Sequence, residues 1–286
     1  MQDRHGVSLG SECKESAILS RTVVLRLLVC AACAVPASRA AWGGGDSPPR
    51  TAATSDSSPA RGRDGVLRVG HFSSAGGKLP QGWEPLEFKN IESHTRYTVV
   101  RDEGGWVVRA ESRGAASGLI RKDLSIDLHD YPVLRWRWRV DNLIAKSNPA
   151  QKEGDDYAAR IYIAFRYEPE RVRPVRKAKF KAAQLLFGEL PIGAISYIWA
   201  TATSIGSIVD NPFAGDFVKM ISVQSGAEAV GRWIEQERNV YEDYKRAFGA
   251  EPPLVEGVAI MTDADNTREV ASASYGDIVF LQTSAK

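Results

Sequence analysis

The segment Val133-Leu134-Arg135-Trp136-Arg137-Trp138-Arg139-Val140 alternates apolar and cationic side chains over its whole length. Successive side chains of a β-strand point to opposite faces, so a strand here buries Leu134, Trp136 and Trp138 and turns its three arginines toward solvent. A strand with one apolar and one charged face belongs to a sheet that covers a core on one side only. The segment therefore predicts a half-buried strand in a layered β structure.

Residues 159–167 repeat this alternation, and their outward side chains are again mostly cationic: Arg160, Tyr162 and Arg166. Seven further segments lie between turn residues and are expected to be strands: 95–100, 105–111, 117–122, 195–201, 217–224, 256–262 and 271–281. Nine short strands with this punctuation predict a mainly β fold, an antiparallel β-sandwich of jelly-roll type.

Two segments have helical periodicity and are expected to be peripheral helices packed at the edge of the sandwich. Residues 176–190 carry small and apolar side chains on one side and stop before Pro191. Residues 240–248 have both ends marked. Asn239 and Glu242 form a capping box at the start, and Gly249 follows the last helical residue.

The first 40 residues have the order of an export signal. Arg21 and Arg26 precede the apolar run 27–35, and Ser38-Arg39-Ala40 has the pattern of a cleavage site. We therefore expect residues 1–40 to be a signal peptide and the protein to be exported, either periplasmic or secreted. The polar stretch before the apolar run is long for a leader, and a true start near Val24 would explain it.

The three cysteines, Cys13, Cys30 and Cys33, all precede the expected cleavage site. The mature chain then has no disulfide and no thiolate ligand. A lipid anchor at Cys30 or Cys33 is disfavoured because the residues before each match a lipobox poorly. Residues 41–63 are rich in Gly, Pro and Ser and are expected to form a disordered tether, which leaves 64–286 as a single β-sandwich domain.

The expected mature chain is formally neutral. Loss of residues 1–40 removes five of the 37 basic and three of the 35 acidic side chains and leaves 32 of each. A neutral domain has no general attraction for nucleic acid or anionic lipid. No apolar run long enough to span a membrane follows residue 40. We expect neither a nucleic-acid partner nor a transmembrane segment in the mature chain.

Two adjacent carboxylates, Asp155 and Asp156, stand just before the strand whose first outward side chain is Arg160. This arrangement could bind a sugar hydroxyl or a cation. An aspartate turn that caps the strand and pairs with Arg160 is the structural alternative.

Oxygen ligands recur at alternate positions near Asp263, Asp265 and Asn266, as Ca²⁺ requires. The EF-hand pattern fails, because Arg268 and Ser274 occupy the positions of its glycine and bidentate glutamate. A polar hairpin turn is favoured, and a structural calcium site of another type stays open. No other cofactor is indicated.

The outward arginines would line one sheet face if the two alternating strands were neighbours: Arg135, Arg137, Arg139, Arg160 and Arg166. Guanidinium groups suit carboxylate or phosphate oxygens, so such a face could bind an acidic glycan. Arginines paired with acidic residues across strands are the alternative. Tyr162, Tyr197 and Trp199 could add an aromatic platform, although Tyr197 and Trp199 share a strand face with Ile195, which is typical of core positions.

Catalytic motifs are poorly supported. The three histidines after residue 40, His71, His94 and His129, lie at unrelated spacings outside any hydrolase or zinc motif. Paired aspartates could hydrolyse a glycoside, but the chemistry depends on a carboxylate separation that a sequence does not provide.

Several strings resemble those of a bacterial family named domain of unknown function three-zero-four-seven. They are Phe72-Ser73-Ser74, Leu79-Pro80-x-Gly82-Trp83, Ala116-Ser117-Gly118-Leu119, Tyr131-Pro132-x-Leu134-x-Trp136-x-Trp138, Gly154-Asp155-Asp156-Tyr157, Arg238-Asn239-Val240-Tyr241-x-Asp243-Tyr244, Phe248-Gly249 and Met261-x-Asp263-x-Asp265-Asn266-Thr267. The resemblance implies an exported protein and supplies no activity or catalytic residue. The closing segment 275–280 is also similar to the last strand of jelly-roll carbohydrate-binding modules, a likeness of fold only.

We expect a non-catalytic binding module for an envelope glycan or another extracytoplasmic ligand. Two alternatives stay open: a glycan-active hydrolase or lyase that uses Asp155, Asp156, Asp263 or Asp265, and an envelope scaffold. The ligand, the metal and the oligomeric state do not follow from the sequence.

Overall fold

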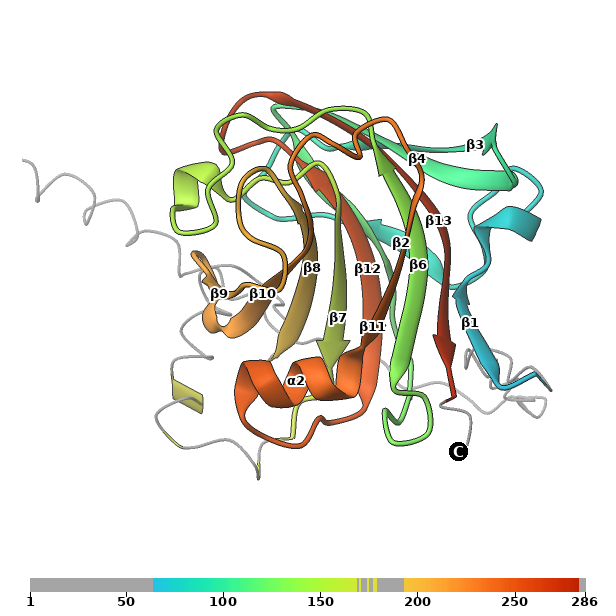
Figure 1. The fold of residues 1–286 in the computed structure, drawn as a ribbon, viewed down its shortest axis with the longest axis vertical. Helices are drawn as coiled ribbons and strands as arrows, with labels where there is room; N and C mark the ends of the chain where they lie inside the picture. The colour runs from blue at the N-terminus through green and yellow to red at the C-terminus, as the bar shows by residue number, and fades with distance from the viewer. Residues whose placement is uncertain (1–63, 169, 171–173, 175–176, 179–192, 283–286) are drawn as a thin grey trace, which may run out of the picture. The chain divides into compact units, whose positions relative to one another are not determined.

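A computed structural model describes residues 64–168, 170, 174, 177–178 and 193–282 (Figure 1). The expected signal peptide and tether lie outside the described residues, and so does nearly all of the expected helix at 176–190. None of the helices in the described part is long and apolar enough to cross a membrane.

The described chain is mainly β. Its strands are β1 (Val66–Gly70), β2 (Trp83–Leu86), β3 (Arg96–Asp102), β4 (Gly105–Arg113), β5 (Ala116–Arg121), β6 (Val133–Val140), β7 (Arg160–Phe165), β8 (Ala194–Ala200), β9 (Ile208–Asn211), β10 (Gly215–Ser225), β11 (Ile234–Asn239), β12 (Val255–Asp263) and β13 (Val270–Leu281). All nine predicted strands are present, with ends that differ by no more than two residues. Four strands were not predicted: β1, β2, β9 and β11.

The strands form two sheets that pack as a sandwich (Figure 1). The six-stranded sheet has the order β11-β6-β13-β4-β3, with β1 also paired to β13. The seven-stranded sheet has the order β2-β5-β12-β7-β8-β10-β9. The antiparallel sandwich is confirmed with one exception, since β8 and β10 pair in parallel. After β8 the chain first forms β9, and β10 then runs antiparallel to β9 and lies between β9 and β8. β10 therefore runs in the same direction as β8.

The alternation in β6 is confirmed. Leu134, Trp136 and Trp138 point between the sheets and are at most 1% exposed. Trp136 stacks on Tyr197 of the opposite sheet with ring centroids 5.3 Å apart, and Trp138 contacts Trp199 at 6.0 Å. Burial of these large rings supplies much of the apolar surface that holds the sheets together.

Helix α2 (Val240–Phe248) has the predicted bounds, the predicted N-cap residue Asn239 and the predicted glycine after its last residue. The side chain of Asn239 accepts a hydrogen bond from the backbone N–H of Glu242 at 3.0 Å. Gly249 ends the helix in the left-handed conformation, with φ 67°, which a glycine adopts without strain. Two short 3₁₀ turns, η1 (Phe72–Ser74) and η2 (Lys152–Gly154), complete the described elements.

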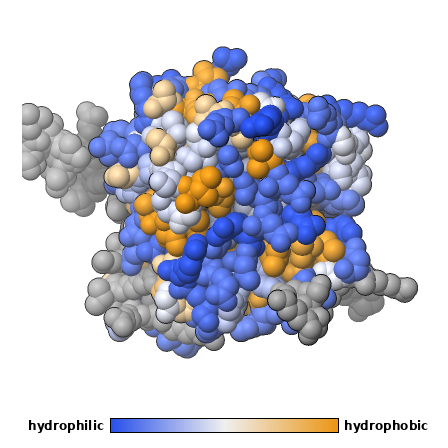
Figure 2. Space-filling view, in the orientation of Figure 1, coloured by the Kyte–Doolittle hydropathy of each residue, from blue (hydrophilic) through white to orange (hydrophobic). Residues whose placement is uncertain are grey.

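The surface in the same view is mostly hydrophilic and carries separate hydrophobic patches (Figure 2). Across the described residues, four large apolar side chains are exposed: Leu79, Ile205, Phe213 and Val270. Isolated apolar side chains of this kind are usual on a protein surface.

Candidate functional site

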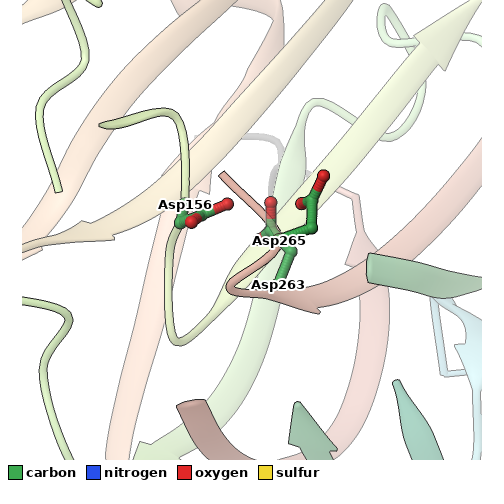
Figure 3. Close-up of side chains that lie close together, drawn as sticks. All are labelled: Asp156, Asp263 and Asp265. Carbon is green, nitrogen blue, oxygen red and sulfur yellow. The ribbon is translucent and has the colours of Figure 1, made fainter. Parts of the chain in front are cut away.

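The two predicted aspartate motifs meet in space. We call Asp155, Asp156, Asp263, Asp265 and Arg160 the acidic cluster. β7 and β12 are antiparallel neighbours, with Met261 opposite Arg160, so the start of β7 lies beside the end of β12. The loop that precedes β7 and the loop that follows β12 therefore share one end of the seven-stranded sheet. Asp156 approaches Asp263 and Asp265 from a separate segment (Figure 3).

Arg160 is the central cation of the acidic cluster, and it is only 2% exposed. Its Nε donates to Oδ1 of Asp263 at 3.0 Å, and its Nη2 contacts the other oxygen of the same carboxylate. Its Nη1 donates to Oδ1 of Asp155 at 3.3 Å, and Nη2 also donates to the backbone oxygen of Asp155 at 3.1 Å. A buried guanidinium needs such partners, because an unpaired buried charge is strongly destabilising.

Asp156 joins the two loops. Its Oδ1 accepts hydrogen bonds from the backbone N–H and the side-chain amide of Asn266, at 3.3 and 3.0 Å, and its Oδ2 accepts from the backbone N–H of Thr267 at 2.6 Å. Asp263 also accepts from the backbone N–H of Tyr157 at 3.3 Å. These bonds give Asp156 and Asp263 fixed positions in the interior of the loop end.

A third segment joins the acidic cluster through Asn211 at the end of β9. Its side-chain amide donates to Oδ2 of Asp155 at 2.8 Å. Its own oxygen accepts from the backbone N–H groups of Phe213 and Ala214. The sequence does not indicate Asn211 as a site residue, because an Asn followed by Pro predicts a turn and says nothing about a carboxylate 56 residues away.

Gly154 explains why the chain can turn into the cluster. A Cβ atom at this residue would lie 2.7 Å from the backbone nitrogen of Asn148 and 2.9 Å from the backbone oxygen of Lys146. Any other residue would force these backbone segments apart. The glycine therefore allows the loop to pass close beneath Asn148 before Asp155 and Asp156.

Negative groups outnumber positive ones in the acidic cluster, which contains four carboxyl groups and one guanidinium. Burial raises the pKa of Asp155, with a further increase from Asp156. Burial and the neighbouring Asp156 also raise the pKa of Asp265, which is only partly buried. Both shifts reflect the cost of holding like charges together away from water.

Three carboxylates could hold a metal ion. Asp156, Asp263 and Asp265 each offer an oxygen, and these oxygens lie within 4.8 Å of one another. Carboxylate oxygens are the ligands that Ca²⁺ prefers. The predicted ligands Asp263 and Asp265 are thus brought together, whereas Asn266 uses its side-chain amide as a donor to Asp156.

Tyr162 stands beside the acidic cluster on the outer face of the seven-stranded sheet. The guanidinium carbon of Arg160 lies 4.9 Å from the ring centroid of Tyr157 and 5.7 Å from that of Tyr162. Tyr157 is buried, but Tyr162 is partly exposed. The fixed guanidinium thus holds one accessible aromatic ring in place, since cation–π contacts favour a defined ring orientation.

The predicted arginine face does not form as a unit. β6 and β7 belong to different sheets, so Arg135, Arg137 and Arg139 lie on the outer face of one sheet while Arg160 lies on that of the other. Arg166, beyond the far end of β7, donates to Oγ of Ser125 at 3.2 Å.

The three arginines of β6 are paired. Arg135 donates to Glu237 of β11 at 2.8 Å, and Arg139 lies 3.0 Å from Asp102 of β3. Arg137 stacks over the ring of Trp233 at 4.5 Å. Arg135 and Arg139 thus form the pairs with acidic residues that the sequence left open as an alternative, whereas Arg137 contacts an aromatic ring.

Trp199 lies between the sheets and is 1% exposed. Its Nε1 donates to the backbone oxygen of Gly226 at 3.3 Å. This interior position does not fit a role on a binding surface. The physical reason is the alternation of β8, which directs Trp199 and Tyr197 into the core.

The solved structures to which the chain is similar include carbohydrate-binding domains and a xylanase. The family 11 carbohydrate-binding module of the cellulosomal cellulase Lic26A-Cel5E of Clostridium thermocellum is 10% identical, with 77% of this chain and 95% of that chain covered and a TM-score of 0.38. The carbohydrate recognition domain of Emp47p is 13% identical, over 77% and 96% of the two chains, with a TM-score of 0.37. The family 11 xylanase from Neocallimastix patriciarum is 9% identical, over 76% and 97%, with a TM-score of 0.30. The chain is thus similar to carbohydrate-binding modules at low identity and low TM-score, and these matches say nothing about its ligand or activity.

Curated proteins provide no match to the chain. A family model described as "Protein of unknown function (DUF3047)" matches residues 81–279, which include the acidic cluster and strands of both sheets. The chain therefore belongs to the DUF3047 family of proteins of unknown function.

Proposed function

We propose that this domain is a non-catalytic binding module for glycans, and that the ligand binds on the outer face of the seven-stranded sheet beside Tyr162. One observation carries the proposal. Tyr162 is partly exposed, and the neighbouring Arg160 is held rigidly by Asp155 and Asp263. A binding surface that is ordered before the ligand arrives loses less entropy on binding.

The chemistry of this surface suits a polyhydroxylated ligand. A tyrosine ring offers an apolar face for the C–H side of a sugar ring and a hydroxyl for its polar edge. Asp265 and Asn266, both partly exposed at the loop end, add a carboxylate and an amide that can bind hydroxyl groups. Few precisely placed polar groups beside an aromatic ring are typical of small-molecule sites.

Burial supports binding rather than catalysis. A general acid or base must lie within hydrogen-bond reach of the reacting group. Asp156 and Asp263 are 0% and 1% exposed, and both are engaged by donors from the protein. A glycan chain on the surface would not reach either carboxylate.

The test is a glycan array that includes neutral and acidic oligosaccharides and soluble peptidoglycan fragments, followed by calorimetric titration of the strongest binder. We expect Tyr162→Ala to weaken the affinity at least about tenfold, because stacking on an aromatic ring is lost. Tyr241→Ala is the matched control, since Tyr241 is a partly exposed tyrosine on α2. Absence of any glycan binding, or equal affinity of Tyr162→Ala and the wild type, would contradict the proposal.

A second candidate, a glycan hydrolase or lyase, is favoured by Asp265. Burial and Asp156 raise the pKa of this partly exposed carboxyl, as a general acid requires. An enzyme would release shorter products from the bound glycan and lose that turnover in Asp265→Asn, with the fold intact. Unchanged glycan after prolonged incubation would exclude this candidate for the glycan tested.

A further inference from the structure

Arg137 of β6 has no carboxylate partner in the described part of the chain. Its neighbours on the same face, Arg135 and Arg139, each pair with a carboxylate. Arg137 instead donates from Nη2 to the backbone oxygen of Glu103 at 2.9 Å. This hydrogen bond leaves most of the N–H donors of the guanidinium group without an acceptor among the described residues.

Two glycines make room for the side chain of Arg137. A Cβ atom at Gly276 would lie 2.5 Å from Cγ and 2.6 Å from Nε of Arg137. Gly276 belongs to the stretch of β13 between Tyr275 and Ile278, where the pairing with β6 shifts its register. A Cβ atom at Gly104, in the turn between β3 and β4, would lie 3.2 Å from both Nη atoms. A glycine inside a strand often marks such a close approach, so the fold holds Arg137 in one place across β13.

Trp233 gives this guanidinium group an aromatic neighbour. The guanidinium carbon of Arg137 lies 4.5 Å from the centroid of the indole ring, and that of Arg139 lies 5.4 Å from it. A cation–π contact orients a guanidinium group without supplying a negative charge. Both Arg137 and Trp233 are partly exposed, so a ligand reaches them from solvent. The pair therefore presents a positive charge beside a flat apolar ring.

Acidic side chains near Arg137 in the strand pairing are engaged by other groups. Glu235 of β11 lies opposite Arg137, but its carboxylate is 3.6 Å from Nε of Arg135. Asp277 of β13 accepts hydrogen bonds from the backbone N–H and the hydroxyl of Ser73, at 2.8 and 2.5 Å. A carboxylate brought by a ligand therefore pairs with Arg137 without breaking an internal ion pair.

We propose that Arg137 and Trp233 form a binding site for a uronic acid residue of an acidic glycan. The guanidinium group binds the sugar carboxylate through paired hydrogen bonds, the geometry in which arginine recognises carboxylates. The exposed part of the indole ring packs against the sugar ring. This site goes beyond the function proposed above, because it lies on the outer face of the six-stranded sheet, whereas Tyr162 belongs to the seven-stranded sheet.

Calorimetric titration with tetragalacturonate and with its fully methyl-esterified form tests this site. The ester keeps the sugar rings and removes the negative charges. We expect the wild type to bind the acid at least about tenfold more tightly than the ester, and Arg137→Gln to lose this preference. Equal affinity for acid and ester in the wild type, or an unchanged preference in Arg137→Gln, would refute the site. Equal affinity for tetraglutamate and tetragalacturonate would refute the assignment to a sugar, because charge alone would then be sufficient.

Arg113→Gln is the matched control. Arg113 is an exposed arginine at the end of β4, and its loss changes the net charge by the same amount. This variant should keep the preference for the acid. Thermal unfolding shows whether each variant is folded. If Arg137→Gln unfolds, Arg137→Lys replaces it, since lysine keeps a cation over Trp233 but lacks the planar fork and should also lose most of the preference.

Tyr162→Ala separates this site from the glycan surface proposed above. The variant should keep the preference for the acid, because Tyr162 lies on the other sheet. Loss of the preference in Tyr162→Ala would assign the acid to Tyr162 and overturn the site at Arg137. Glycan binding that depends on Tyr162, with no preference for the acid, would refute the site at Arg137 and leave the proposed function intact.

Discussion

Arg160 illustrates what an alternating pattern predicts for a single residue. The alternation of β7 places Arg160 on the outer face of its sheet, and the structure agrees. The pattern gives the face of the sheet but not the exposed fraction of the side chain. Arg160 is only 2% exposed, because the loop before β7 and the loop after β12 lie beside it. The guanidinium is tolerated there because Asp155 and Asp263 pair with it.

Asp265 should make stability depend on pH in the opposite sense to most carboxylates. Its pKa is raised in the folded state by burial and by Asp156, so the folded protein binds this proton more tightly than the unfolded chain. The resulting stabilisation is present in acid and is lost as pH rises through the raised pKa. We expect Asp265→Asn to melt at a higher temperature than the wild type at neutral pH, with the difference vanishing below the usual carboxyl range.

Glu111→Gln supplies a comparison of opposite sign. A hydrogen bond from Arg96 lowers the pKa of Glu111, so its stabilisation is present at neutral pH and is lost in acid. This variant should melt below the wild type at neutral pH and converge with it in acid. A melting difference for Asp265→Asn that is constant with pH would show that its carboxyl group has no raised pKa in the folded protein.

At the scale of elements, β11 shows why some strands escaped prediction. Its sequence, Ile234–Asn239, contains one apolar residue and carries no alternating apolar pattern. It is a strand because it pairs with β6, where Glu235 and Glu237 lie opposite Arg137 and Arg135. A polar edge strand is stabilised mainly by its pairing with the neighbouring strand, so its own sequence does not predict a β-strand.

Helix α2 is fastened to both sheets by one buried carboxylate. Asp243 is 3% exposed and accepts hydrogen bonds from Tyr197 of β8 at 2.9 Å and from Nε of Arg238, at the end of β11, at 2.9 Å. Arg246 on the helix donates to the same carboxylate at 3.0 Å. Arg238 and Asp243, which both belong to the segment Arg238–Tyr244 that resembles the family, are thus in direct contact.

We expect Asp243→Ala to destabilise the domain by about 3–5 kcal/mol, because it leaves a guanidinium and a buried phenol without their acceptor. Chemical denaturation measures this loss of unfolding free energy. Glu242→Ala changes the exposed neighbour, whose backbone and not its side chain takes part in the cap, and should cost less than about 0.5 kcal/mol. Equal effects of the two variants would mean that Asp243 does not hold the helix in place.

At the scale of the whole molecule, the sequence predicted the sandwich better than its connections. Each predicted strand follows from local alternation, as in β6 and β7. The pairing of β8 with β10, and the separation of β6 and β7 into two sheets, depend on contacts between distant segments. The same limit applies to the site: Asp155 and Asp263 were both singled out, yet only the folded chain brings them to one arginine.

The acidic cluster ties distant parts of the chain together, so a bound cation should stabilise the molecule as a whole. Asp156, Asp263 and Asp265 place carboxylate oxygens within 4.8 Å of one another, and Arg160 balances only part of their charge. Ca²⁺ would replace this repulsion by attraction. We expect millimolar Ca²⁺ to raise the melting temperature and an excess of chelator to reverse the rise, since a ligand that binds only the folded state stabilises it.

The variant Asp265→Asn should abolish this response to Ca²⁺. The variant Asp210→Asn, which removes an exposed carboxylate of β9, should keep it. A melting temperature that changes with neither Ca²⁺ nor chelator would contradict this prediction. It would mean that the hydrogen bonds to Asp156 and Asp263 are enough to stabilise these carboxylates without a metal.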